Sequence, residues 1–142
     1  MSLSQTPLGH TTINGHTVRF YPSPLPGPDY PWHVMGDLMD ALELPDHWQR
    51  SAIDKFTQAW PEHCRTIAVA DSTLAIGSSL CGLGLLEWLS TENGRKIAEE
   101  RDAFMDAMSL GLARQMKHLP PAEFETICQI AAARHSQGAG SA

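Results

Sequence analysis

The chain has 142 residues, of which 42% are hydrophobic and 18% are charged. This length suits a single domain that buries its own core, and the composition excludes both a disordered chain and a highly charged coiled coil. Ten lysines and arginines stand against 16 acidic residues, which gives a formal net charge of −6. Any binding of nucleic acid must therefore be local, because the surface as a whole repels phosphates.

The cysteines and the start of the chain indicate the compartment. Cys64, Cys81 and Cys128 are odd in number and far apart in sequence, unlike the paired framework of a small secreted domain. The first residues lack the basic and apolar regions of a secretory signal, and no uninterrupted apolar run is long enough for a membrane span. We expect a cytoplasmic protein.

The first third of the chain predicts a small sheet and one short helix. Residues 12–21 contain an Asn-Gly pair followed by alternating apolar residues, which is typical of a hairpin turn and a half-buried strand. The next ten residues hold five prolines and should form a surface loop. Residues 32–34 form a short strand, after which Gly36 or Asp37 caps a helix that stops before Pro45.

The middle of the chain adds a second helix over about 46–60, with Asp46 as its N-cap, and a strand over 66–70. A turn and a second short strand follow. A compact helix is expected over 80–89 despite Gly82 and Gly84, which close packing against a neighbour would explain.

Two helices complete the chain. Apolar residues recur at helical spacing over about 91–119, and a double proline separates this long helix from a last one over 122–135 and a flexible tail. The predicted fold class is α+β, with a small antiparallel sheet packed with helices, then the long helix and the C-terminal helix. Residues 1–119 form the main unit, and residues 120–142 belong to the same domain.

The sequence contains only weak signals for a catalytic or metal-binding site. His63 and Cys64 adjoin, with His47 on the preceding helix, but structural zinc needs four convergent ligands, usually in CxxC or HxxxH pairs. No nucleophile motif such as GxSxG is present. We expect no metal, no cofactor and no catalytic residue; an enzyme that uses His47, His63 or Cys64 is the minority alternative.

Basic residues fall in two groups that could contact nucleic acid. Two lie on the second predicted helix and three near the start of the long one: Arg50, Lys55, Arg95, Lys96 and Arg101. The helix pair joined at residues 44–46 superficially resembles a helix-turn-helix, but nearby aspartates make its second helix a poor recognition helix. The other interpretation is that these cations lie on solvated helix faces.

The large apolar residues indicate a core and a dimer interface. We expect the four tryptophans to be core or interface anchors, with Trp60 and Trp88 the most buried. The apolar stripes of the last two helices exceed what the sheet needs, so they predict a homodimer seam. Its residues are Phe104, Met108, Leu112, Phe124 and Ile127.

The order of these features over residues 12 to about 116 resembles the Bro-N domain of phage antirepressors and related viral and prophage regulators. The family motif of an aromatic, Val and a small residue, with Asp opening a helix that ends in Ala-Leu, reads here as PWHVMGDLMDAL over residues 31–42. The family then has a second helix, a strand, a Gly-Leu turn into a short apolar helix, and a helix that opens with basic residues and an aromatic residue. In this chain these correspond to SAIDKFTQAW, TIAVA, LGLLEWL and GRKIAEERDAF. His33 stands where the family usually has an aromatic residue, and the closing helix lacks the usual Trp and Leu-Pro ending.

This resemblance implies a non-enzymatic regulator of a phage, prophage or mobile element. We expect it to bind DNA as a transcriptional regulator, through the five basic residues and as a homodimer. The alternative is a protein-binding inhibitor or antirepressor that sequesters a repressor or host protein and touches no nucleic acid. The electrostatic balance decides how many phosphates each chain can contact.

Overall fold

The computed structural model describes residues 7–25, 29–91, 94–115 and 121–140. It confirms the α+β fold class. One antiparallel five-stranded sheet has the order β1-β2-β3-β5-β4. Its strands are β1 (Gly9–Ile13), β2 (His16–Tyr21), β3 (Trp32–Val34), β4 (Cys64–Val69) and β5 (Ser72–Gly77).

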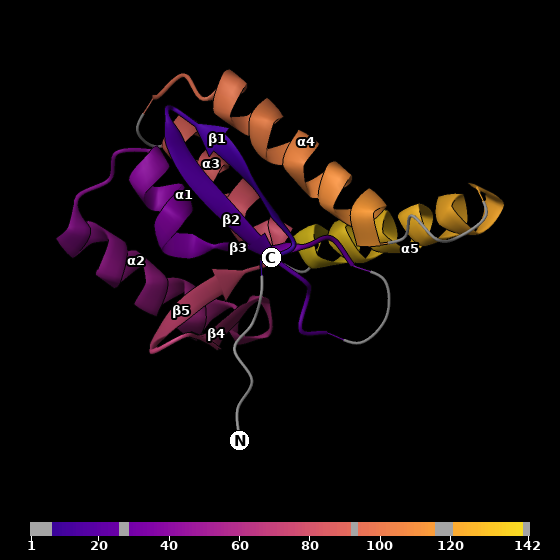
Figure 1. Ribbon diagram of the computed structural model, residues 1–142. Coiled ribbons are helices and arrows are strands. Elements are labelled where there is room, and N and C mark those ends of the chain that lie inside the picture. The colour runs from indigo at the N-terminus through magenta and orange to yellow at the C-terminus, as the bar shows by residue number, and fades with distance from the viewer. Residues whose placement is uncertain (1–6, 26–28, 92–93, 116–120, 141–142) are drawn as a thin grey trace.

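Five α-helices and one short 3-10 helix accompany the sheet in the described part of the chain. They are α1 (Met35–Ala41), α2 (Asp46–Ala59), η1 (Pro61–His63), α3 (Ser79–Thr91), α4 (Ala98–Gln115) and α5 (Pro121–Gly140). In Figure 1, α3 and α4 lie along one side of the hairpin formed by β1 and β2, and α2 lies on the opposite side of that hairpin. Within the described residues, none of the helices combines the length and the apolar character of a membrane span.

The predicted hairpin is confirmed. Asn14 and Gly15 have φ values of 52° and 79°, the left-handed conformation that the two-residue type I′ turn requires. Ile13 pairs with His16 across this turn, so the sequence fixes the register of β1 against β2. The side-chain amide of Asn14 also donates to the carbonyl of Ala41 at 2.9 Å, which ties the turn to the end of α1.

The main core lies between one face of the sheet and helices α1, α3 and α4. Alternate residues of β2, Val18 and Phe20, point into this core and are buried. Phe104 of α4 packs against Phe20 and is fully buried. A Cβ atom on Gly82 of α3 would overlap the Phe104 ring, and one on Gly84 would lie 3.3 Å from Trp60. The two glycines are thus explained by close packing, as the sequence predicts.

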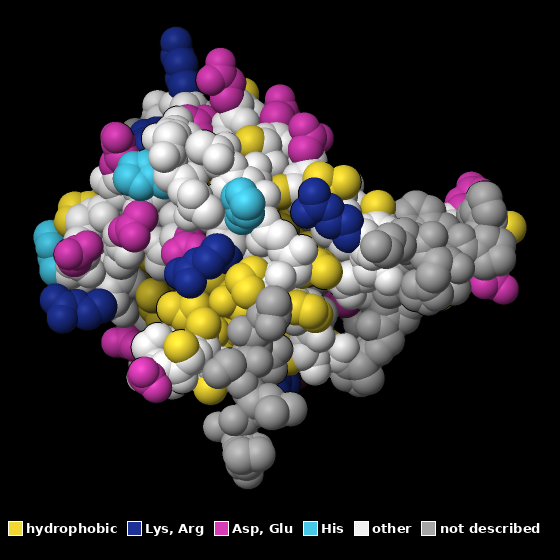
Figure 2. Space-filling model, viewed as in Figure 1, with side chains coloured by type: hydrophobic (Ala, Val, Ile, Leu, Met, Phe, Trp, Pro, Cys, Tyr) yellow, Lys and Arg dark blue, Asp and Glu magenta, His cyan; other side chains and the backbone are white. Residues whose placement is uncertain are grey.

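The other face of the sheet carries a smaller apolar cluster. Tyr21, Trp32, Val34 and Ile76 are buried there. The indole N–H of Trp32 donates to Asp29 at 3.2 Å, which fastens the proline-rich loop over this cluster. On the face shown in Figure 2, hydrophobic side chains gather below the centre of the view.

The burial prediction for the tryptophans is wrong. Trp32 on a central strand is fully buried, whereas Trp88 is 37% exposed and Trp60 is half-buried. Trp88 lies near the end of α3, where its ring packs 5.2 Å from that of Trp48, between ring centres, at the surface. Hydrophobic periodicity identifies a helix face, but the topology decides how deep that face lies.

Two helices differ from the predicted ones in their bounds, and a third differs in its cap. The long helix begins at Ala98 rather than near residue 91, because Gly94 has a φ of 65° and Ile97 turns into the core. The last helix runs over Pro121–Gly140 instead of 122–135. Helix α2 has the predicted start, but Pro45 is its N-cap and no side chain caps it.

Candidate functional site

Three of the five predicted nucleic-acid-binding residues lie around one hollow at the start of α4. Arg95, Lys96 and Arg101 line it together with Ser90, Ile97, Ala98 and Asp102, and its volume is about 600 Å³. The amide of Arg101 is bonded to the carbonyl of Ile97, so the preceding amides of the first turn have no acceptor inside the helix. Their positive partial charge adds to that of the three cations.

The three cations have different roles. The guanidinium of Arg95 donates to the carbonyl of Leu42 at 2.8 Å, and its amide donates to that of Leu89 at 3.0 Å. This side chain is therefore held between the end of α1 and the end of α3. Lys96 and Arg101 are exposed and make no hydrogen bond or ion pair with the described residues. They are free to contact an anion.

Arg50 and Lys55 do not belong to this hollow. Both are exposed on α2, and a separation of five residues places them about 140° apart around the helix axis. They cannot both face one DNA backbone as a compact pair. The structure therefore brings together the cations of the long helix and leaves those of α2 separate.

Acidic residues limit the positive potential of the hollow. Glu99 and Glu100 occupy the first turn of α4, and Asp102 lines the hollow itself. On the face shown in Figure 2, the cations appear singly among acidic side chains. The geometry supports contact with a few phosphates and not a continuous basic track.

The predicted dimer residues lie mostly inside the single chain. Phe104, Met108 and Leu112 are at most 1% exposed, and Phe104 packs against the rings of Phe20 and His33. These three side chains cover the chain's own sheet, so they cannot form an exposed seam. Ile127 is half-buried on α5, which contacts α3. The Phe124 side chain lies outside the described residues.

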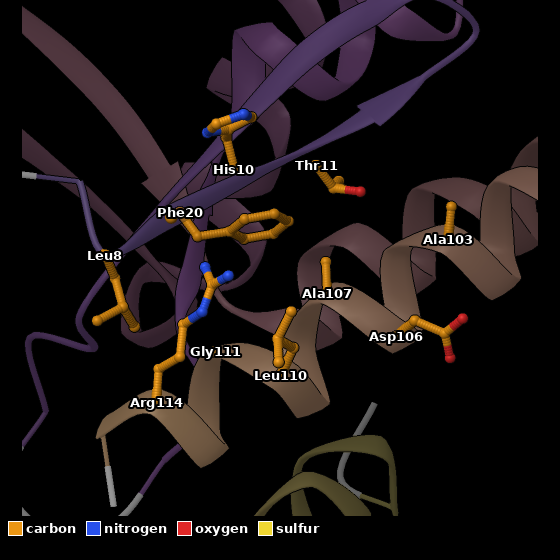
Figure 3. Close-up of a pocket in the computed structure, with 11 residues that line it drawn as sticks. Leu8, His10, Thr11, Phe20, Ala103, Asp106, Ala107, Leu110, Gly111 and Arg114 are labelled. Atoms are coloured by element: carbon orange, nitrogen blue, oxygen red, sulfur yellow. The ribbon is translucent and has the colours of Figure 1, made fainter. Parts of the chain in front are cut away.

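A cleft between β1 and α4 is a feature that the sequence did not reveal. It has a volume of about 300 Å³ and is shown in Figure 3. Phe20, Ala103 and Ala107 give it an apolar floor, while Leu110 and Arg114 stand at its rim. The only sequence signal is the small-residue spacing 103, 107 and 111 on one side of α4, which by itself is indistinguishable from an ordinary helix contact.

Two of the three residues of the enzyme alternative, His63 and Cys64, lie beside Ser78 and Cys81. Nδ1 of His63 lies 2.9 Å from Oγ of Ser78, and the sulfurs of Cys64 and Cys81 are 3.6 Å apart. Ser78 Oγ accepts the Cys81 amide at 3.4 Å, which places Ser78 as a cap for the start of α3. The hydrogen bond with Cys64 and burial raise the pKa of the Cys81 thiol, so Cys81 stays protonated and is a poor nucleophile. The same hydrogen bond lowers the pKa of the Cys64 thiol.

Metal binding also lacks a suitable ligand set. Among the residues that the structure describes, no three His, Cys, Asp or Glu side chains converge on a common point. His47 is exposed on α2 and is not part of the cluster at His63. Structural zinc requires four convergent ligands, so the geometry here gives no support to a metal centre.

His33, which the sequence left unexplained, is a core residue. It is buried on β3 with its ring edge against Phe104, at 5.2 Å between ring centres. Its Nδ1 is buried and has no hydrogen-bond partner among the described residues. Burial lowers the pKa of His33 to about 4, so the side chain is neutral at physiological pH.

Comparison of the chain with protein-family models, with curated proteins and with solved structures finds no match.

Proposed function

We propose that the protein is a non-enzymatic regulator of a phage, prophage or mobile element, and that it acts as a DNA-binding transcriptional regulator. The observation that carries this proposal is the hollow where Arg95, Lys96 and Arg101 meet the free amides of the first turn of α4. Helix N-termini and nearby cations are a common phosphate-binding arrangement. The motif resemblance to the Bro-N domain supports the same class.

The expected footprint is small. Lys96 and Arg101 are free, and Arg95 is fixed beside them by its bond to Leu42. Two or three phosphate contacts per chain predict a slope of about −2 to −3 in a plot of log K against log salt. Binding by a single chain should therefore be weak, and a second DNA-bound chain would be needed for high affinity.

The test is a titration of a fluorescent duplex across salt with three proteins. The double variant Lys96→Glu with Arg101→Glu should lose binding at the lowest salt. Arg65→Glu is the control for a charge reversal elsewhere on the surface, because Arg65 is exposed on β4 and does not line the hollow. It should weaken binding only through the change in net charge. Absence of wild-type binding at low salt, or an affinity indifferent to salt, would rule out the DNA proposal.

The second candidate function is the protein-binding inhibitor or antirepressor. Exposed apolar side chains favour it: Leu110 on α4 is 52% exposed and Ile130 on α5 is 44% exposed. The net charge of −6 also disfavours nucleic acid. This candidate predicts no DNA binding, together with a stoichiometric complex from a host lysate that the double variant Leu110→Glu with Ile130→Glu does not form. If neither the wild type nor the double variant captures a stoichiometric partner from the lysate, the protein-binding function is contradicted.

A further inference from the structure

In the part of the chain that the structure describes, β1 is an edge strand with a strand neighbour on one side only. Because the two-residue turn closes at Ile13 and His16, the alternation of an antiparallel ladder turns the backbone groups of His10 and Thr12 away from β2. The amide of Arg19, which faces His10 across the pair, accordingly bonds to Asp37 on its other side. The outer edge of β1 therefore presents backbone donors and acceptors to a further strand.

The cleft between β1 and α4 lies beside this edge. Its floor is apolar, with the Phe20 ring between β1 and Ala107 of α4 in Figure 3, and Leu110 rises from α4 at the rim. A volume of about 300 Å³ leaves room for a large apolar side chain. A strand added to β1 would point alternate side chains toward α4 and into this space.

The two ends of the cleft carry opposite charges. Arg114 lies at the β1 start, where a Cβ on Gly9 would be 2.6 Å from its Nη1, and Asp106 lines the cleft eight residues earlier on α4. Neither side chain forms an ion pair or hydrogen bond with the described residues. Eight helical residues span about 12 Å, which is about four residues of an extended chain.

We propose that this cleft binds an extended peptide segment of a partner protein, which adds to β1 as a sixth strand. The segment has an acidic side chain opposite Arg114, an apolar side chain two residues away in the cleft, and a basic side chain two residues further, opposite Asp106. This is strand addition, in which main-chain bonds give affinity and alternate side chains give specificity. The inference concerns a different surface from the hollow at the start of α4 and does not depend on DNA binding.

A second copy of this chain fits the cleft less well. Pairing β1 with another β1 would offer only Gly9, His10, Thr11, Thr12 and Ile13, which include no carboxylate for Arg114. A peptide with alternating acidic, apolar and basic residues satisfies both charges and the apolar floor. Charge complementarity therefore selects a peptide from another protein.

The proposal can be tested with the capped heptapeptide Thr-Glu-Thr-Leu-Thr-Lys-Thr, titrated into the isotopically labelled full chain by NMR. The expected result is saturable shifts of the amides of β1 and of the α4 residues that line the cleft. Replacing the glutamate of the peptide by lysine should weaken binding at least tenfold. Arg114→Glu should reverse this preference, so that the lysine peptide binds the variant more tightly than the original peptide does.

A separate variant tests how much the outward backbone amides of β1 contribute to peptide binding. Thr12→Pro removes an outward amide without changing charge, and proline is tolerated on an edge strand where the amide faces solvent. It should abolish binding while the far-UV spectrum stays that of the wild type, and Arg65→Glu should bind as the wild type does. If Thr12→Pro fails to fold, the charge-reversal pair still decides the question.

Four results would overturn the proposal. The first three are equal affinity for the glutamate and lysine peptides, shifts confined to residues outside the cleft, and absence of saturation at millimolar peptide. A fourth is a wild-type chain that sediments as a dimer and binds the peptide only as the dimer dissociates, since a second copy would then occupy the edge.

Discussion

The carboxylate of Asp37 on α1 binds both the backbone and the side chain of Arg19 on β2. Asp37 Oδ2 accepts the Arg19 amide at 3.0 Å and the guanidinium Nε at 2.8 Å, and Oδ1 accepts Nη2 at 3.0 Å. The register of β2 against β3 places Arg19 opposite Val34, the N-cap of α1, and Asp37 in the first turn of that helix accepts the Arg19 amide. The prediction that Asp37 caps the amides of its own helix is wrong, because α1 has no side-chain cap.

Asp37→Ala should lower the free energy of unfolding by about 2 kcal/mol, because it leaves one backbone amide and one guanidinium without an acceptor. Urea denaturation measures the change. Asp54→Ala is the matched control, since Asp54 is exposed on α2 and no ion pair engages it in the described structure; its effect should stay within about 0.5 kcal/mol. Equal midpoints for the two variants would show that the Arg19 contact does not stabilise the fold.

Two helical glycines should respond in opposite directions to alanine. Gly82→Ala forces a methyl group into the Phe104 ring, whereas a Cβ on Gly36 meets no atom within 4 Å. We expect Gly82→Ala to destabilise the fold by about 1 to 3 kcal/mol and Gly36→Ala to stabilise it by about 0.5 to 1 kcal/mol. Thermal melts of both variants provide the measurement, and a Gly82→Ala melt at or above the wild-type temperature contradicts the packing described here.

Stability should fall in mild acid through His33. Its pKa is about 4 in the folded chain, against the ordinary histidine value of 6.5 that applies when the chain is unfolded, so between these values the unfolded chain binds more protons. The stabilising contribution is complete above pH 6.5 and is lost as pH falls toward 4. From pH 7 to pH 5 the expected loss is about 2 kcal/mol.

His33→Phe isolates this effect, because it keeps an aromatic ring against Phe104 and cannot titrate. The change in unfolding free energy between pH 7 and pH 5 should be smaller in the variant by about 2 kcal/mol, whatever its absolute stability. Parallel pH profiles for wild type and variant would mean that His33 binds as many protons in the folded chain as in the unfolded chain, so that folding does not lower its pKa.

The cysteines should divide into one reactive and two protected thiols. Cys64 and Cys81 are buried with their sulfurs 3.6 Å apart, while Cys128 on α5 is half-buried. A thiol reagent such as Ellman's reagent should modify one thiol quickly in the native chain and all three in denaturant. Cys128→Ser should remove the fast phase. A fast phase that survives this substitution would place an accessible thiol on Cys64 or Cys81.

Local signals in the sequence predicted the elements well. The Asn14-Gly15 pair specifies the hairpin and its register because the required backbone conformation is a property of those two residues. The grouping of Lys96 and Arg101 was also predictable, since residues so near in sequence stay close in any tertiary arrangement. Helix boundaries were less predictable, because Gly94 and Ile97 end the regular pattern through their own conformation and burial.

The sequence by itself determined the α+β class, the hairpin and the order of strands and helices, because turn chemistry and apolar periodicity act over a few residues. Only the tertiary structure decided that Phe104 and Met108 cover the chain's own sheet and that His33 is a neutral core residue. It also placed Arg114 of α4 beside Gly9 of β1, across a cleft that no local pattern encodes. These are contacts between segments distant in the chain, and a repeat of apolar residues does not specify which surface it will meet.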